Sequence, residues 1–236
     1  MSLRLGIDID GVVADFRTSF HAAAKQCLGR EIPELEDARS AQALEQKDVK
    51  RVWQHVAKTP NWWMGLQAYE PEQLARLYGL SRTRGWEVFF LTNRPASAGD
   101  TVQFQSQWWL EQHGFYLPAV LTVPGSRGEV ANGLRLDLIV DDLVLNCVEA
   151  VSASTSKALL MLRSADQATQ EYATDRGIGV VSTFADALVV IEHLHEVMPS
   201  RRGRLLRLAD WFWTTPPAQG LPQNPRVERP IPPHNP

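Results

Sequence analysis

The stretch Leu5-Gly6-Ile7-Asp8-Ile9-Asp10-Gly11-Val12-Val13 decides the fold of this chain. Its first part is apolar on both faces, which is typical of a buried strand in a parallel sheet covered by helices. Two carboxylates, Asp8 and Asp10, stand two residues apart where this run ends, and Gly11 lets the chain turn away. Ligands of open α/β sheets bind beyond the carboxyl ends of the strands. The stretch therefore predicts a strand that leads directly into a ligand site.

Six short apolar runs recur along the chain, and segments of helical period separate them. The runs span residues 3–9, 87–91, 119–123, 136–140, 158–162 and 179–181. Helices are expected at residues 100–113, 127–133, 144–151, 166–176 and 184–197. Buried runs that alternate with helices indicate a doubly wound, Rossmann-like α/β fold with a parallel sheet.

The interval between the first two runs breaks this rhythm, because about seventy-five residues are far too many for one crossover. The pattern predicts helices at residues 15–28, 37–46, 48–58 and 71–84. The last of them is expected to return the chain to the sheet. The other three would form a small α-helical cap, inserted at about 15–70 into a core domain that spans residues 1–198.

The C-terminal stretch, residues 199–236, has a different character. Arginines at positions 201, 202, 204 and 207 accompany an apolar helical face made by residues 205, 208, 209 and 212. Eight prolines follow from residue 215 onward, which predicts an extended tail. Three interpretations of this basic amphipathic helix stay open. It packs on the domain, it is an arm that binds a partner or joins the copies of an oligomer, or it binds a membrane surface.

The composition excludes several classes of protein. Of the 236 residues, 44% are hydrophobic and 22% are charged, as in a folded globular protein rather than a disordered one. With 24 basic and 27 acidic side chains the net charge is −3, so no basic field attracts a nucleic acid polymer. No apolar run approaches the roughly 18 residues of a membrane span. The two cysteines, at positions 27 and 147, form no disulfide framework, which favours a reducing, cytoplasmic location.

Polar side chains also follow two other apolar runs. Thr92, Asn93 and Arg94 end one run, and Asp141 and Asp142 end another. Each group alone has an ordinary interpretation, as a turn or as a helix cap. Together with the first stretch, they would bring four carboxylates and a hydroxyl to one rim of the sheet. Carboxylates this close repel one another unless a cation lies between them, and oxygen ligands suit Mg²⁺.

In this order the motifs resemble those of the haloacid dehalogenase superfamily of phosphotransferases, over about residues 1–198. The matching positions are Asp8-x-Asp10-Gly11-Val12, then Thr92, then Asp141-Asp142. That family has a lysine at the start of the helix before the last acidic strand. Here the segment Gly125-Ser126-Arg127-Gly128-Glu129 holds an arginine, and none of the five lysines lies between Thr92 and Asp141. Arg127 is therefore the expected cation, with Arg94 as a substitute.

The resemblance implies a catalytic role for four residues. Asp8 would attack phosphorus and form an aspartyl-phosphate, and Asp10 would protonate the leaving group and later activate water. Thr92 and Arg127 would hold the oxygens of the transferred phosphoryl group. Because Asp10 stands two positions after the nucleophile, the resemblance favours a phosphatase over a dehalogenase.

The resemblance also implies a Mg²⁺ site made of Asp8, Asp10, Asp141 and Asp142. Asp8, Asp141 and the main-chain carbonyl of Asp10 would bind the ion directly, and Asp142 would lie just outside these ligands. The physical chemistry agrees, because phosphoryl transfer depends chiefly on positioning and charge neutralisation.

The substrate is expected to be a small phosphorylated metabolite. The motif Asp141-Asp142-x-x-x-Asn146 and the chain length look most like the 5′(3′)-deoxyribonucleotidase branch, which implies a nucleotide. The cap holds aromatic residues at positions 16, 20, 53, 62 and 63, which could stack on a nucleobase or simply pack in the core. The expected substrate-binding residues are Asn93, Arg94, Phe16, Trp62 and Trp63. A phosphatase for a sugar or other metabolite phosphate, and a binding protein without catalysis, stay open as alternatives.

Overall fold

A computed structural model of the chain describes residues 2–32 and 44–197. Met1 and residues 33–43 and 198–236 lie outside the described residues. Two elements expected from the sequence fall there, namely most of the helix at 37–46 and the C-terminal helix with its proline-rich tail.

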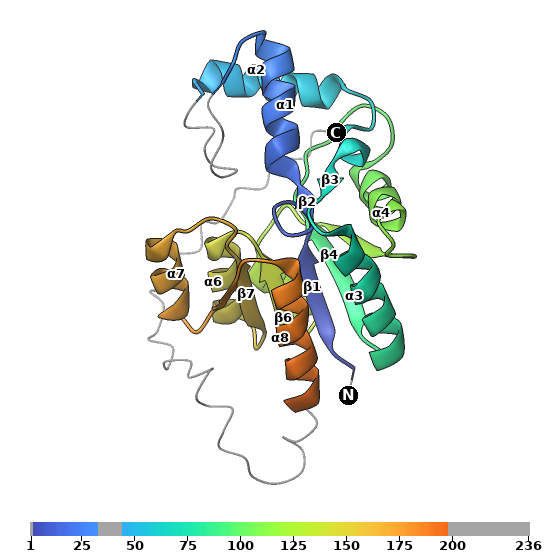
Figure 1. Ribbon diagram of the computed structural model, residues 1–236, viewed down its shortest axis with the longest axis vertical. Helices are drawn as coiled ribbons and strands as arrows, with labels where there is room; N and C mark the ends of the chain where they lie inside the picture. The colour runs from blue at the N-terminus through green and yellow to red at the C-terminus, as the bar shows by residue number, and fades with distance from the viewer. Residues whose placement is uncertain (1, 33–43, 198–236) are drawn as a thin grey trace, which may run out of the picture.

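Six parallel strands form one sheet at the centre of the described structure (Figure 1). They are β1 (Arg4–Asp8), β4 (Glu87–Thr92), β5 (Ala119–Thr122), β6 (Leu138–Asp141), β7 (Lys157–Met161) and β8 (Gly179–Val181). Their order is β5-β4-β1-β6-β7-β8, with Asp8 of β1 opposite Leu91 of β4, and Ile7 opposite Val140 of β6. The doubly wound, Rossmann-like α/β fold is confirmed, and the ends of β1, β4 and β6 are neighbours.

Helices cover both faces of the sheet (Figure 1). One face carries α5 (Arg127–Gly133), α6 (Val144–Ala153) and α7 (Gln167–Thr174). The other carries α3 (Pro71–Arg84), α4 (Val102–Gln112) and α8 (Phe184–Val197). Their ends are set by caps: Ser126 Oγ accepts from the amide of Gly128 at 3.1 Å where α5 begins, and Gly85 with φ +69 ends α3. None of the described helices is long and apolar enough to cross a membrane.

A helical segment, residues 14–68, is inserted between β1 and α3. It contains β2 (Ala14–Asp15), α1 (Phe16–Leu28), α2 (Gln46–Lys58), the 3₁₀ helix η2 (Trp62–Gly65) and β3 (Gln67–Ala68). β2 pairs with β3 in antiparallel fashion, so the chain leaves the core and returns to it side by side. α1 and α2 share a buried cluster that includes Phe20 and Val52. Figure 1 shows these two helices beyond the end of the sheet at which β1 leads into β2.

Candidate active site

The carboxyl ends of β1, β4 and β6 open into a cavity with a volume of about 460 Å³. Asp8, Thr92 and Asp141 are the last residues of these three strands. Most of the predicted site residues line the cavity: Asp8, Asp10, Phe16, Trp63, Thr92, Asn93, Arg94, Arg127 and Asp142. Asp141 is fully buried and does not line it, and neither does Trp62.

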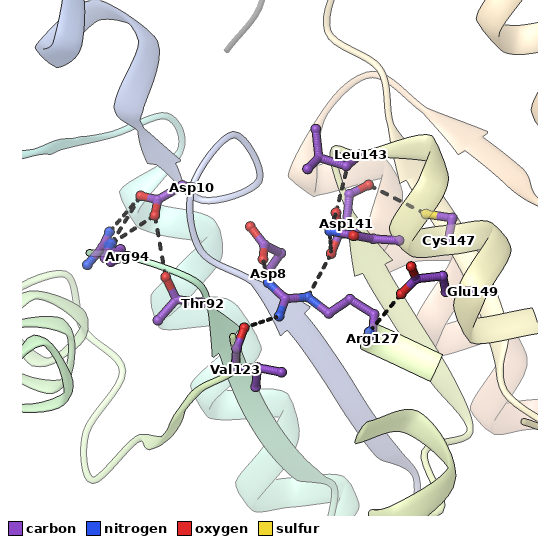
Figure 2. Close-up of polar contacts among 11 residues, drawn as sticks. Asp8, Asp10, Thr92, Arg94, Val123, Arg127, Asp141, Leu143, Cys147 and Glu149 are labelled. Atoms are coloured by element: carbon purple, nitrogen blue, oxygen red, sulfur yellow. Dashed lines mark hydrogen bonds and ion pairs between the residues drawn. The ribbon is translucent and has the colours of Figure 1, made fainter. Parts of the chain in front are cut away.

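Arg127 joins Asp8 to Asp141 (Figure 2). Its Nη2 donates to Oδ1 of Asp8 at 2.7 Å, and its Nε donates to Oδ2 of Asp141 at 3.3 Å. Nη1 donates to the carbonyl of Val123 at 3.4 Å. Arg127 is the first residue of α5, and its main-chain amide donates to Glu149 at 3.0 Å, which fixes the start of that helix. Because Asp8, Arg127 and Asp141 are all buried, they form one desolvated unit.

Asp141 is held from its other side by the start of α6. The amide of Leu143 donates to Oδ1 at 2.9 Å. The side-chain amide of Asn146 donates to both carboxylate oxygens, at 2.9 and 3.0 Å. These contacts fix the orientation of the Asp141 carboxylate and account for Asn146 in the motif that follows β6.

The buried unit of Asp8, Arg127 and Asp141 contains two carboxylates but only one guanidinium. Burial, and next the neighbouring Asp141, raise the pKa of Asp8 well above its usual value, and Arg127 opposes this only in part. Burial also raises the pKa of Asp141, against the opposite effects of Arg127 and the Leu143 amide. Burial alone would lower the pKa of Arg127, but the two carboxylates raise it. A further cation would therefore be stabilised here.

The donor atoms at this point fit Mg²⁺. Gly11 has φ +83, and a Cβ on it would overlap the carboxylate of Asp142, so this carboxylate lies against the loop that carries Asp10. Asp8, Asp142 and that loop offer oxygen ligands. The described residues hold no group of three or more His, Cys, Asp and Glu side chains arranged as a metal site. Mg²⁺ commonly takes only one or two carboxylates and completes its shell with water or phosphate, so this donor set suits the ion.

Asp10 belongs to a second, separate pair (Figure 2). Nε of Arg94 donates to both of its carboxylate oxygens, at 3.2 and 2.9 Å, and Nη2 donates to Oδ1 at 2.8 Å. The hydroxyl of Thr92 lies 3.5 Å from Oδ2. Nη1 of Arg94 donates to the hydroxyl of Ser106 at 2.9 Å. The carboxylates of Asp8 and Asp10 thus face different arginines.

Aromatic rings from the helical segment form one wall of the cavity. Phe16 stacks on Trp53 and on Trp63, with ring centroids 5.9 and 6.0 Å apart, and all three residues line the cavity. Trp63 is only 1% exposed, and its indole N–H donates to the carbonyl of Pro95 at 3.0 Å. Trp62 packs edge-on against Trp63 and lines a second cavity of about 380 Å³ instead.

Among the cavity-lining residues that were not predicted as site residues are two arginines and two aromatic residues: Arg17, Arg163, Trp53 and Tyr69. Arg163 follows β7, and its guanidinium donates to the carbonyls of Gly11 at 3.2 Å and Val12 at 2.7 Å. It also lies over the ring of Tyr69, 3.8 Å from the centroid, and burial raises the pKa of that phenol to about 12. A charged residue just after a buried strand is the signal already used for β1 and β6, and it would have found Arg163.

Several solved structures that share this architecture are haloacid dehalogenase-like hydrolases. One from Streptococcus pneumoniae has a TM-score of 0.53 at 16% identity, over 80% of this chain and 98% of that chain. A haloacid dehalogenase (HAD) family hydrolase from Deinococcus radiodurans, solved with bound phosphate and sodium, has a TM-score of 0.55 at 13% identity. The match covers 81% of this chain and 96% of that chain. The fold is that of the haloacid dehalogenase-like hydrolases.

A predicted phosphoglycolate phosphatase from Haemophilus somnus has this haloacid dehalogenase-like fold too, with a TM-score of 0.52 at 13% identity, over 80% of this chain and 98% of that chain. No protein-family model matches the sequence, and no curated protein matches it. At identities this low the likeness establishes the fold alone. The chemistry of this chain therefore has to follow from its own side chains.

Proposed function

We propose that this chain is a Mg²⁺-dependent phosphomonoesterase that works through an aspartyl-phosphate. The observation that carries the proposal is the buried unit at the end of β1, in which Arg127 lies 2.7 Å from Asp8 and 3.3 Å from Asp141. It puts a carboxylate that could act as the nucleophile beside a guanidinium, at the rim where open α/β sheets bind ligands. The hydroxyl of Thr92 borders the same cavity.

The reaction would have two steps. A carboxylate oxygen of Asp8 attacks phosphorus, the bond from phosphorus to the leaving oxygen breaks, and Asp10 gives that oxygen a proton. Asp10 then takes a proton from water, whose oxygen attacks phosphorus and releases phosphate from Asp8. Arg127 binds Oδ1 of Asp8 and, with Thr92, would hold the phosphoryl oxygens.

Mg²⁺ bound by Asp8, Asp142 and the main-chain carbonyl of Asp10 would neutralise charge on the phosphoryl group. The raised pKa of Asp8 supports this assignment, because the protein alone does not compensate the ionised carboxylate. Asp141, whose two oxygens accept hydrogen bonds from Arg127, Leu143 and Asn146, would lie behind these ligands and would not bind the ion directly.

The proposed substrate is a nucleoside monophosphate. Phe16 and Trp53 present stacked rings to the cavity that holds Asp8, and base–aromatic stacking contributes about 1–3 kcal/mol per base. The helical segment 14–68 would act as the cap that supplies this wall to the core domain. The reaction would take place in the cytoplasm, where the free thiols of Cys27 and Cys147 stay reduced.

The test is phosphate release from deoxy- and ribonucleoside monophosphates and from sugar phosphates, with Mg²⁺ and with EDTA. The variant is Asp8→Asn, and the matched control is Asp175→Asn at an exposed position on the end of α7. We expect release that needs Mg²⁺, is lost in Asp8→Asn and persists in Asp175→Asn. A folded protein that binds Mg²⁺ but releases no phosphate from any compound would contradict the proposal and favour a binding protein. A preference for sugar phosphates would replace the nucleotide assignment and leave the phosphatase in place.

A further inference from the structure

Arg94 lines the cavity, yet its side chain has 0% exposed surface. Each of its three guanidinium nitrogens donates a hydrogen bond. Nε and Nη2 bind the carboxylate of Asp10, and Nη1 binds the hydroxyl of Ser106. One face of the guanidinium lies over the ring of Trp63, 4.8 Å from the centroid. Arg94 is therefore packed on all sides by protein.

The groups around Arg94 are themselves fixed. Ser106 is fully buried on α4, and so is its neighbour Gln105, whose Oε1 accepts from the amide of Trp63 at 3.2 Å. The indole of Trp63 donates to the carbonyl of Pro95, the residue after Arg94, at 3.0 Å. Arg94 thus sits in a frame made by α4, η2 and the end of β4.

We propose that Arg94 is a positioning residue that acts through Asp10 rather than by contact with the substrate. The inference rests on the proposed function, in which Asp10 protonates the leaving group. Arg94 holds both oxygens of Asp10 from the protein side and fixes the direction of a side chain that is 22% exposed and lines the cavity. The reacting group is thus aimed by a frame that extends into the helical segment.

Direct binding of a phosphate by Arg94 would cost these contacts. Because the Arg94 side chain has no exposed surface, a phosphate could reach its guanidinium only if it turned away from Asp10 and Ser106, and a buried polar group left without a partner is expensive. Arg127, by contrast, already lies beside the proposed nucleophile. The geometry therefore assigns different roles to the two arginines. Arg127 would bind the phosphoryl group, and Arg94 would position the proton donor, Asp10.

The two roles of Arg94 predict different responses to the leaving group. When the bond from phosphorus to the leaving oxygen breaks, an alkoxide needs the proton of Asp10, whereas 4-nitrophenolate is stable without one. Loss of a residue that holds the phosphoryl group would slow both substrates equally, because they share that group. Loss of a residue that aims Asp10 would slow the alkyl phosphate more.

The experiment measures kcat/KM, which reports the step up to phosphoryl transfer, for 4-nitrophenyl phosphate and for an alkyl phosphate such as a nucleoside 5′-monophosphate. The variants are Arg94→Gln, which removes the fork, and Ser106→Ala, which removes an anchor of Arg94 without touching Asp10. Arg4→Gln is the control, because Arg4 is a partly buried arginine at the opposite end of β1.

We expect Arg94→Gln to lower kcat/KM for the alkyl phosphate about 100-fold, the lower end of what a general acid contributes, and for the aryl phosphate less than about 10-fold. Ser106→Ala should shift the ratio in the same direction by a smaller factor, and Arg4→Gln should leave it unchanged. In an Asp10→Asn background, Arg94→Gln should cause no further loss with the aryl phosphate, because the group it positions is gone.

Equal losses for both substrates, or a further loss in the Asp10→Asn background, would overturn the inference. If Arg94→Gln does not fold, Ser106→Ala decides, and an unchanged ratio in that variant counts against the inference. A wild-type protein that hydrolyses neither substrate would overturn the proposed function and this inference with it. An active wild type whose variants keep the wild-type ratio would overturn this inference alone.

Discussion

Replacing Arg127 with methionine removes the guanidinium that two buried carboxylates share. The side chains of Asp8, Arg127 and Asp141 are 8%, 4% and 0% exposed, so little water reaches the groups that are left behind. Methionine keeps much of the length and apolar stem of the arginine. The variant therefore tests the charge of Arg127 rather than its volume.

The expected loss of stability is large. Removal of one partner from a buried ion pair costs about 3–5 kcal/mol, much of it the penalty for the uncompensated charge that remains. In a chain of 236 residues each kcal/mol corresponds to about 2–4 °C in Tm. For Arg127→Met in EDTA, the free energy of unfolding should fall by about 3–5 kcal/mol and Tm by roughly 6–20 °C.

Thermal unfolding in EDTA and in excess Mg²⁺ measures this loss. Arg127→Lys should lose less stability than Arg127→Met, because lysine keeps the positive charge. It should still lose some, because one ammonium nitrogen replaces three nitrogens that donate in different directions. Addition of Mg²⁺ should raise the Tm of Arg127→Met more than it raises the Tm of wild type. In the variant the divalent cation replaces the charge that neutralised both carboxylates. Arg176→Met, at an exposed position, should stay within about 0.5 kcal/mol of wild type. A Tm for Arg127→Met within about 2 °C of wild type in EDTA would refute the electrostatic account of this unit.

Three further predictions follow from single contacts. Asp8→Asn should stabilise the metal-free protein increasingly as the pH rises. Because the folded pKa of Asp8 is raised, its contribution to wild-type stability is complete below about pH 4 and is lost as the pH rises through the folded pKa. A difference in Tm between the two proteins that does not change with pH in EDTA would contradict this. Gly11→Ala should cost more in urea unfolding than Gly29→Ala, although positive φ alone costs each roughly 1–3 kcal/mol. A Cβ on Gly11 would overlap a carboxylate, whereas nothing lies within 4 Å of one on Gly29, so equal costs would argue against the close approach. Trp53→Ala should raise KM for a nucleoside monophosphate about 5- to 150-fold, the equivalent of 1–3 kcal/mol of stacking, and spare an alkyl phosphate without a ring. Trp62→Ala, which alters an aromatic residue outside the cavity, should leave both KM values unchanged, and a larger effect there than at Trp53 would reverse the assignment.

The sheet could be predicted from the sequence because its strands are buried on both faces. A run such as residues 138–140 is apolar throughout, and a turn or helix cap follows it, so its type and order are evident. α3, α5 and α8 also have the expected bounds. The two-residue strands β2 and β3 could not be predicted, because they depend on pairing between residues more than fifty positions apart. η2 was missed as well, since it follows Asn61, a non-glycine residue with φ +51.

The members of the site were easier to predict than their orientation. Neighbouring strand ends bring residues 8, 92 and 141 together whatever their side chains do. That the carboxylate of Asp10 turns from Asp8 to Arg94 depends on Ser106, on a helix that packs beside β4 and β5. The sequence predicted a single cation among all four carboxylates, because the contact between Asp10 and Arg94 could not be foreseen. Similarly, the choice between Trp53 and Trp62 depends on how η2 sits against α1, which no pattern in the sequence specifies.

The contacts of Arg127 show what an arginine can do at this position that a lysine could not. A lysine has one nitrogen, so its three N–H groups leave from a single point. Arg127 serves Asp8, Asp141 and the carbonyl of Val123 from three separate nitrogens, which lets it bridge two strand ends. A guanidinium has five N–H groups in a planar fork, and these three contacts use one from each nitrogen. The second N–H groups on Nη1 and Nη2 are the donors that we expect on the phosphoryl oxygens, so the same side chain could hold both the proposed nucleophile, Asp8, and the phosphoryl group that it would attack.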